Sequence, residues 1–263
     1  MTPMLGIMAS QISGHLAPSA PVAGMYSWYD AADTATISLS GSAVTQWNDK
    51  GSGANNFTQS NSTYRPSSGT RSQNGKNIID FDGTNDNLSF GTPANFKFLH
   101  SAVSTCFFAV VSDVTTGGAM MGDDGGGSSI PGFAFWNFGV AKISQEIANA
   151  SATIVSNNSA ANIYTAGSFY YFSALGDPGN GTAANRSTMK YKGGANWNNN
   201  TLTGAVSTAN PGAARVQIGD EGYAVGPDAP FNGGIGEIII YNTTLSSGDV
   251  ALNNAYLAAK WGV

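Results

Sequence analysis

The chain has 263 residues, of which only 10% are charged, and its formal net charge is −5. A chain of this length buries a sizeable core. Its polar surface must come mainly from Asn, Ser, Thr and Gly, which favour turns and strand edges over helices. No run of basic residues occurs, which argues against a nucleic-acid partner. No apolar run is long enough for membrane insertion.

The first 20 residues differ in character from the rest. A short apolar stretch without a preceding basic region leads into the small-residue text "APSAPVAG". This pattern does not favour a cleaved secretory signal, and the second part is typical of a linker. We therefore predict an N-terminal arm over residues 1–20 and one folded domain over residues 21–263. The arm is either a docking peptide or a disordered leader.

From residue 25 onward, short apolar and alternating segments follow one another between turns. Such spacing predicts an all-β domain with two packed antiparallel sheets. The segment 104–113 is continuously apolar, which predicts a strand covered on both faces. The predicted strands lie within residues 25–30, 44–47, 78–81, 88–90, 104–113, 133–146, 168–177, 187–195, 214–222 and 231–242.

Two segments between these strands have turn or loop chemistry. Asp82, Gly83 and Asp86 lie in "DGTND", where Asp and Asn bond to nearby backbone and Gly adopts positive φ, so a tight turn is predicted. Residues 117–132, "GGAMMGDDGGGSSIPG", are predicted to form a glycine-rich loop.

One helix is predicted, at the end of the chain. Ser246 is a suitable N-cap, and Asp249 places a carboxylate near the positive end of the helix. Val250, Leu257 and Trp261 then recur at roughly helical spacing. We expect this stripe to pack on the sandwich, with Trp261 as its anchor, and to cover one face of the strand that precedes it.

Little in the sequence indicates catalysis. A glycosidase needs two carboxylates beside the scissile bond, but Glu146, Glu221 and Glu237 have no acidic neighbour in the E-x-D-x-E pattern of sandwich glucanases. His15 and His100 have no G-x-S-x-G serine elbow to serve. Cys106 lies in an apolar run and is predicted to be buried and unreactive. We therefore predict a protein that is not an enzyme and that needs no cofactor.

Three blocks of sequence resemble the laminin-G/concanavalin A-like jelly-roll domains of bacteria and phages. The blocks are residues 28–50, the "FDGTND" turn and the ending "FNGGIGEIIIYNTTLSS". The resemblance implies a jelly-roll sandwich over residues 24–263. The residues that carry this signature are Trp28, Trp47, Asp82, Gly83, Asp86, Glu237, Tyr241, Asn242, Ser246 and Trp261.

The arm sequence "MLGIMASQISGHL" resembles the opening of phage tail and other virion proteins. The two resemblances together imply a structural virion protein, a tail fibre, spike or capsid decoration, made in the host cytoplasm. It would form a homo-oligomer and contact other virion proteins through its arm. The docking residues would be Leu5, Ile7, Met8, Ile12 and Leu16. The alternatives are a secreted bacterial carbohydrate-binding module and, third, a glycan hydrolase.

A lectin-like domain would bind host-surface glycans through aromatic faces and polar loop groups. The residues proposed for this are Trp136, Asn137, Tyr223 and Asp228, with a core role for Trp136 as the alternative. Many relatives of this kind bind Ca²⁺, which prefers oxygen ligands. Asp123 and Asp124 are the candidate ligands, and a solvated loop is the alternative.

Overall fold

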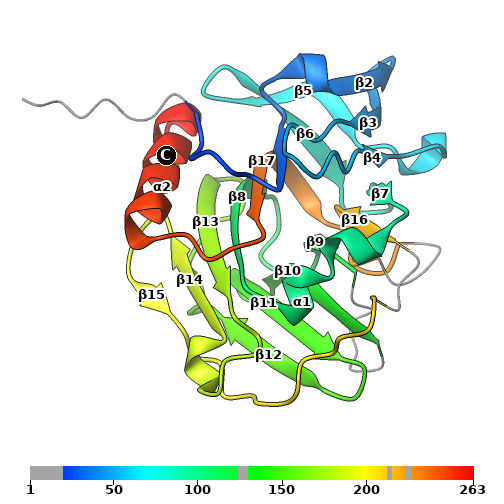
Figure 1. Ribbon diagram of the computed structural model, residues 1–263. Helices are drawn as coiled ribbons and strands as arrows, with labels where there is room; N and C mark the ends of the chain where they lie inside the picture. Colours follow the sequence, from blue (N-terminus) through cyan, green and yellow to red (C-terminus); the bar gives the residue numbers. More distant parts are fainter. Residues whose placement is uncertain (1–19, 124–129, 212–214, 223–226) are drawn as a thin grey trace, which may run out of the picture.

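The computed structural model describes residues 20–123, 130–211, 215–222 and 227–263. Its strands form one continuous antiparallel sheet that folds into two facing layers, a nearly closed sandwich (Figure 1). This confirms the all-β prediction, whereas the jelly-roll connectivity stays a prediction. The described helices are all too short or too polar to cross a membrane.

The first layer lies next to the C-terminal helix, where β1 and β6 pair with successive halves of β17. From β17 it continues through β8, β13 and β14 to β15. Its strands are β1 (Ser27–Asp30), β5 (Ser67–Gln73), β6 (Lys76–Asp82), β8 (Ser104–Ser112), β13 (Phe169–Gly176), β14 (Ser187–Tyr191), β15 (Asn196–Trp197) and β17 (Asn232–Tyr241).

The second layer runs in the order β2, β3, β4, β7, β16, β9, β10, β11 and β12. A single pairing of Ala43 with Ser67 joins it to the first layer through β5. Its strands are β2 (Ile37–Ser40), β3 (Ala43–Trp47), β4 (Phe57–Thr58), β7 (Leu88–Phe90), β9 (Ala119–Gly122), β10 (Pro131–Phe138), β11 (Lys142–Asn149), β12 (Thr153–Asn158) and β16 (Val216–Ile218).

Strand β8 shows why a continuous apolar run forms here. All nine of its residues are buried. Its side chains alternate between two apolar clusters: Cys106, Phe108 and Val110 face the core between the layers. Phe107, Ala109 and Val111 face the C-terminal helix. The strand is therefore covered on both faces, as predicted.

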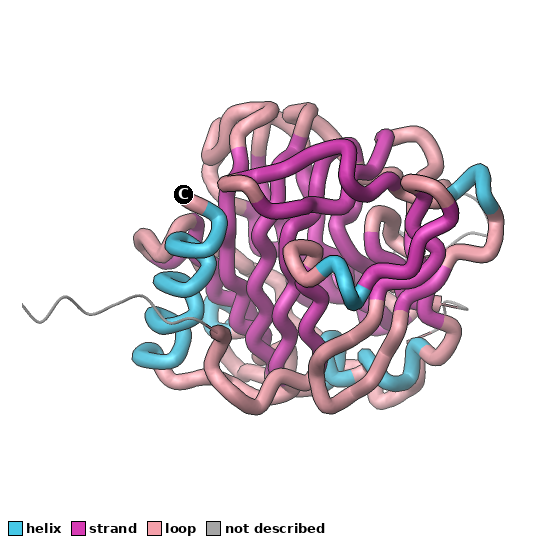
Figure 2. Tube along the Cα trace, turned by 90° about the horizontal axis from the view of Figure 1, so that it is seen from above, coloured by secondary structure: helices cyan, strands magenta, loops and turns pink. Residues whose placement is uncertain are grey.

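That helix, α2 (Ser247–Trp261), lies against the outer face of the first layer (Figure 2). Ser246 caps it as predicted, since its hydroxyl oxygen accepts a hydrogen bond from the Asp249 N–H at 3.1 Å. Val250, Leu257 and Trp261 are buried in the cluster beneath it, which confirms the predicted stripe. The other helical segments are α1 (Phe98–Ser101) and 3₁₀ turns at Thr34–Thr36, Ser62–Tyr64, Pro93–Phe96 and Ala183–Asn185.

Hydrogen bonds from one hairpin and from Val22 hold α2 and the start of the domain in place. The β5–β6 turn has positive φ at both Asn74 and Gly75, which suits the twist of a two-residue hairpin. Gln73 and Asn74 donate side-chain hydrogen bonds to the last carbonyls of α2, at 2.9 Å and 3.1 Å. Val22 is fastened by its N–H to Asn253 and by its carbonyl to Tyr241.

The turn at residues 82–86 is confirmed. Gly83 has φ of 71°, and Oδ1 of Asp82 accepts the N–H groups of Thr84 and Asn85. The prediction of a loop throughout 117–132 is wrong, because β9 crosses it. Met120 and Met121 are fully buried in the core, so this short strand forms despite its flanking glycines.

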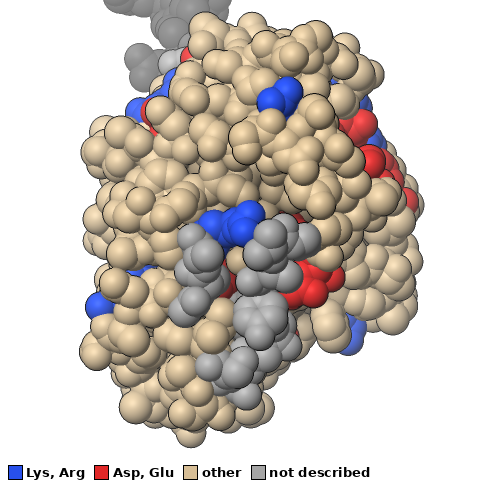
Figure 3. All heavy atoms as spheres, turned by 90° about the vertical axis from the view of Figure 1, so that its right-hand side faces the viewer, with Lys and Arg blue, Asp and Glu red and all other residues tan. Residues whose placement is uncertain are grey.

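Charged side chains are sparse over much of the face seen in Figure 3, as the composition led us to expect. The arm residues 1–19 proposed for docking lie outside the described residues.

Candidate functional site

A β-bulge in β17 lies directly before a carboxylate that faces α2. The register with β8 shifts between Ile235 and Glu237, leaving Gly236 as the extra residue. A bulge of this kind re-aims side chains, and here Gly236 and Glu237 both face the helix. A Cβ on Gly236 would lie 2.8 Å from ring atoms of Trp261, so only glycine lets the helix approach this closely.

Glu237 is fully buried and meets four donors. Its Oε1 accepts hydrogen bonds from the Trp28 indole and the Tyr256 hydroxyl, both at 2.7 Å. Its Oε2 accepts from the Trp261 indole at 2.9 Å and lies 2.9 Å from the Lys260 ammonium. A buried carboxylate needs this many partners to offset its lost hydration. Burial raises the pKa of Glu237, and the Lys260 charge opposes that shift.

Asp30 links this buried pair to the surface. It lies on β1, where Tyr29 faces the core and the neighbouring Trp28 contacts the helix-side cluster. Its Oδ1 is 2.6 Å from the Lys260 ammonium, and its Oδ2 is 3.3 Å from Lys50. Lys50 also pairs with Asp33 at 2.8 Å and lies 3.9 Å from the Trp28 ring centroid. Lys50 and Lys260 thus each pair with two carboxylates, and they share that of Asp30.

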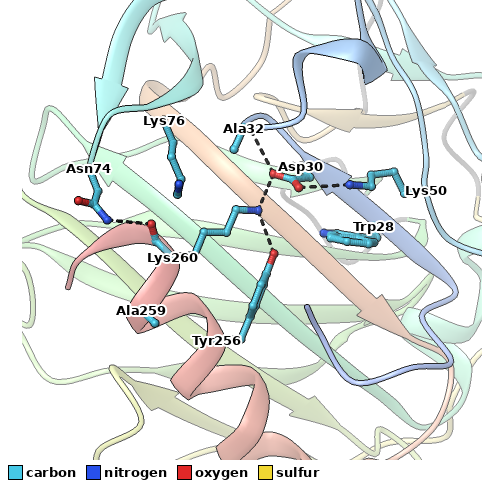
Figure 4. A pocket seen from close by; sticks show the side chains of 9 residues that line it. All are labelled: Trp28, Asp30, Ala32, Lys50, Asn74, Lys76, Tyr256, Ala259 and Lys260. Atoms are coloured by element: carbon cyan, nitrogen blue, oxygen red, sulfur yellow. Dashed lines mark hydrogen bonds and ion pairs between the residues drawn. The ribbon is translucent and has the colours of Figure 1, made fainter. Parts of the chain in front are cut away.

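Above this network lies an open pocket of about 500 Å³, which we call the α2 pocket (Figure 4). Its walls come from β1, the segment after β3, the β5–β6 hairpin and the last turns of α2. It is lined by Trp28, Asp30, Ala32, Lys50, Asn74, Lys76, Tyr256, Ala259 and Lys260. The pocket offers aromatic surface, ammonium donors and a carboxylate acceptor on regular, well-packed elements.

The residues predicted to bind glycan are not gathered in this pocket. Trp136 is half-buried on β10, and its indole N–H has no partner among the described residues. Asn137 is fully buried in the core, where its amide bonds to Ser112 and Tyr170. Asp228 is exposed before β17. Tyr223 lies outside the described residues.

The calcium prediction concerns a place that is described only in part. Asp123 is fully buried at the end of β9, and its Oδ1 accepts the Phe133 N–H at 2.7 Å. Asp124 lies outside the described residues. In the described part of the chain, no group of three or more His, Cys, Asp or Glu is placed to hold a metal ion.

Other reactive residue types are buried in structural positions. His100 is fully buried with its Nε2 3.2 Å from the Ala209 carbonyl oxygen, and burial lowers its pKa to about 4. Cys106 is buried as predicted, and burial raises the pKa of its thiol. Glu146 on β11 is only half-buried, and this burial raises its pKa.

The sequence did not reveal the α2 pocket. Trp28, Glu237 and Trp261 were singled out as fold signature, but the contact between Trp28 and Glu237 spans 209 residues of chain. One signal was available: a lone glutamate inside "GIGEIIIY", a strand predicted to be covered on both faces, has to find buried partners. Three of these partners, Tyr256, Lys260 and Trp261, lie on the helix that follows the strand.

No family model matches the sequence, and no curated protein matches it. Among solved structures, Trypanosoma rangeli sialidase with 2,3-difluorosialic acid matches with TM-score 0.57 and 12% identity, over 91% of this chain and 33% of that chain. The same enzyme with sialic acid matches with TM-score 0.56 and 11% identity, over 93% and 36%.

A third match is the CBM40 domain of Ruminococcus gnavus IT-sialidase bound to α2,3 sialyllactose. Its TM-score is 0.47 at 11% identity, over 67% of this chain and 96% of that one, and this likeness is too distant to carry an argument. The sialidase matches show the fold alone. This chain spans about a third of the length of those sialidase chains.

Proposed function

We propose that this protein is a non-enzymatic glycan-binding domain that holds a sugar in the α2 pocket. We also propose that its sandwich is of the laminin-G/concanavalin A-like jelly-roll type, in keeping with the sequence signature. The fold it shares with sialidases is consistent with a carbohydrate ligand.

The pocket itself carries the proposal. Its volume, about 500 Å³, falls in the usual range for small-ligand sites and is enough for one or two sugar rings. Trp28 and Tyr256 contribute aromatic surface, which suits the apolar face of a pyranose. Lys76 adds a lysine side chain from the β5–β6 hairpin that can donate to sugar hydroxyl groups.

The same geometry argues for binding without hydrolysis. Hydrolysis of a glycosidic bond needs carboxyl groups that reach the substrate. Glu237 has no exposed surface and is held by four protein donors. Asp30 is 5% exposed and paired with two lysines. Both carboxylates therefore serve the architecture of the pocket floor.

Filling the pocket tests the proposal. Ala259 lines it from the exposed side of α2, so Ala259→Tyr should occlude it without touching the buried network. Ala251→Tyr, also exposed on α2 but outside the pocket, is the matched control. Both proteins are applied to a glycan array. We expect Ala259→Tyr alone to lose binding. Equal binding by both variants, or no binding by the wild type, would overturn the proposal, and release of reducing sugar would revive the hydrolase alternative.

We propose further that the domain is displayed on a phage particle, as a tail fibre, spike or decoration protein. The resemblance of residues 1–20 to virion proteins supports this role, as does the fastening of Val22 to α2, which gives such an arm a firm root. Deleting residues 1–20 should abolish incorporation into particles while leaving glycan binding intact. Unchanged incorporation would exclude docking through the arm. A homo-oligomeric state stays a prediction.

A further inference from the structure

We propose that the ligand of the α2 pocket is an acidic glycan and that Lys76 binds its anionic group. This inference rests on the proposed function and narrows it to sugars that carry a carboxylate or a sulfate. The argument depends on which of the three pocket lysines still has donors to offer.

All N–H donors of the Lys260 ammonium are already used within the protein. An ammonium group has three N–H donors. In Lys260 they meet Asp30 at 2.6 Å, Glu237 at 2.9 Å and the Tyr256 hydroxyl at 2.9 Å. Lys260 is thus a structural cation that holds the pocket floor together, and a ligand could recruit it only by breaking a buried pair.

Lys50 is largely committed as well. It pairs with Asp30 at 3.3 Å and with Asp33 at 2.8 Å, and its ammonium rests over the Trp28 ring. At most one N–H remains for a ligand. Lys50 therefore contributes chiefly by neutralising the carboxylates around it.

Lys76 is different. It lines the pocket from the first position of β6, and within the described chain its ammonium forms no ion pair or hydrogen bond. Figure 4 shows its side chain extending from the β5–β6 hairpin toward α2 and Lys260. The hairpin that carries it is anchored to the end of α2 by Gln73 and Asn74. An uncommitted cation is thus presented from a fixed backbone.

The distribution of charge favours an anion at Lys76. Three lysines are balanced by three carboxylates, but Asp30, Asp33 and Glu237 all pair with Lys50 or Lys260. Lys76 is therefore the pocket cation that has no carboxylate partner among the described residues. A carboxylate or sulfate on a sugar would meet three free donors on Lys76 in charge-assisted hydrogen bonds.

The test compares full-length wild type, Lys76→Gln and Lys142→Gln on an array of neutral, carboxylated and sulfated oligosaccharides. Lys142 is the matched control, since it begins β11 in the other layer and has no ion pair among the described residues. We expect wild type and Lys142→Gln to bind acidic members preferentially. Lys76→Gln should bind them about tenfold more weakly, as expected for loss of one charge-assisted contact. Comparing the carboxylated and sulfated members identifies which anionic group is bound.

The binding pattern shows which proposal fails. Binding of neutral glycans with no preference for acidic ones would overturn the acidic-ligand inference while leaving the proposed function intact. A preference for acidic glycans that survives Lys76→Gln would overturn the role of Lys76. Absence of binding to every member would overturn the proposed function and this inference together.

Discussion

The Lys260 ammonium lies 2.9 Å from Oε2 of Glu237, beneath a helix that leaves the carboxylate no exposed surface. Glu237 lies within β17, and Lys260 lies near the end of α2, the next element along the chain. Trp261 and Tyr256 on the helix bond to the same carboxylate, so three residues of α2 are joined to one residue of β17.

Removing the Lys260 ammonium should lower the free energy of unfolding. In Lys260→Met, Glu237 and Asp30 keep their burial but lose the ammonium that they share, so we expect a loss of about 3–5 kcal/mol in the free energy of unfolding. Chemical denaturation measures it. Adding Glu237→Gln to Lys260→Met should restore part of the loss, since the buried charge is then gone. A Lys260→Met protein within about 1 kcal/mol of wild type would contradict this account.

Adding a side-chain carbon at Gly236, the bulge residue, should also destabilise the fold. A Cβ at position 236 would lie 2.8 Å from Trp261 and 2.9 Å from Phe169, both large rings in the packed cluster. Gly236→Ala should therefore cost about 1–3 kcal/mol. Gly248→Ala, in the first turn of α2, meets no atom closer than 3.7 Å. We expect that control to be neutral or slightly stabilising in a thermal melt. The reverse order of stabilities would show that the close approach at Gly236 is unimportant.

The helix cap gives a smaller effect. Ser246→Ala removes the hydroxyl that accepts the Asp249 N–H, and we expect a loss of about 1 kcal/mol. Ser247→Ala, one residue later and also exposed, removes a hydroxyl that makes no hydrogen bond within the described chain. Parallel urea titrations of the two variants compare them, and equal stabilities would argue that the cap contributes nothing.

Asp86 should make stability depend on pH. Burial raises its pKa from the ordinary 3.8 to about 7. Over this interval the folded state keeps a proton that the unfolded state has released, so the contribution of Asp86 is present at low pH and is lost as pH rises toward 7. Asp86→Asn keeps an acceptor for the Asp82 N–H but carries no charge.

Between about pH 4 and about pH 8, the difference in unfolding free energy should therefore shift in favour of Asp86→Asn by roughly 2–4 kcal/mol. Denaturation of both proteins across this range checks the sign. A difference that is flat with pH, or that shifts in favour of wild type, would refute the raised pKa.

Local patterns were enough to predict the elements whose neighbours in sequence determine them. The run around Phe107, the turn at Gly83 and the cap at Ser246 each carry their own chemistry, and each is confirmed. Strands β5 and β12 were not predicted, because "SSGTRSQ" and "TIVSNN" are rich in polar residues. Such segments become strands only when a neighbouring strand supplies their hydrogen bonds.

The site was harder to foresee for a related reason. The pocket draws its walls from four segments, and a bulge at Gly236 interrupts the alternation of β17. Counted from Ile235, which faces the core, alternation would turn Glu237 away from α2. Counted from Ile239 and Tyr241, which face the helix, it turns Glu237 toward α2. For Asn137, by contrast, the alternation along β10 indicates the buried position correctly. Phe133 and Phe135 lie on the same face of the strand, and both are core residues.

The fastening of Val22 has a mechanical consequence. Its N–H and carbonyl are bonded to Asn253 and Tyr241, and β1 then pairs antiparallel with the second half of β17. A pull applied through the first twenty residues would therefore load the last strand and the last helix before it reached the facing layer. The two ends of the chain would share the strain, and the hairpins of the second layer would be shielded from it.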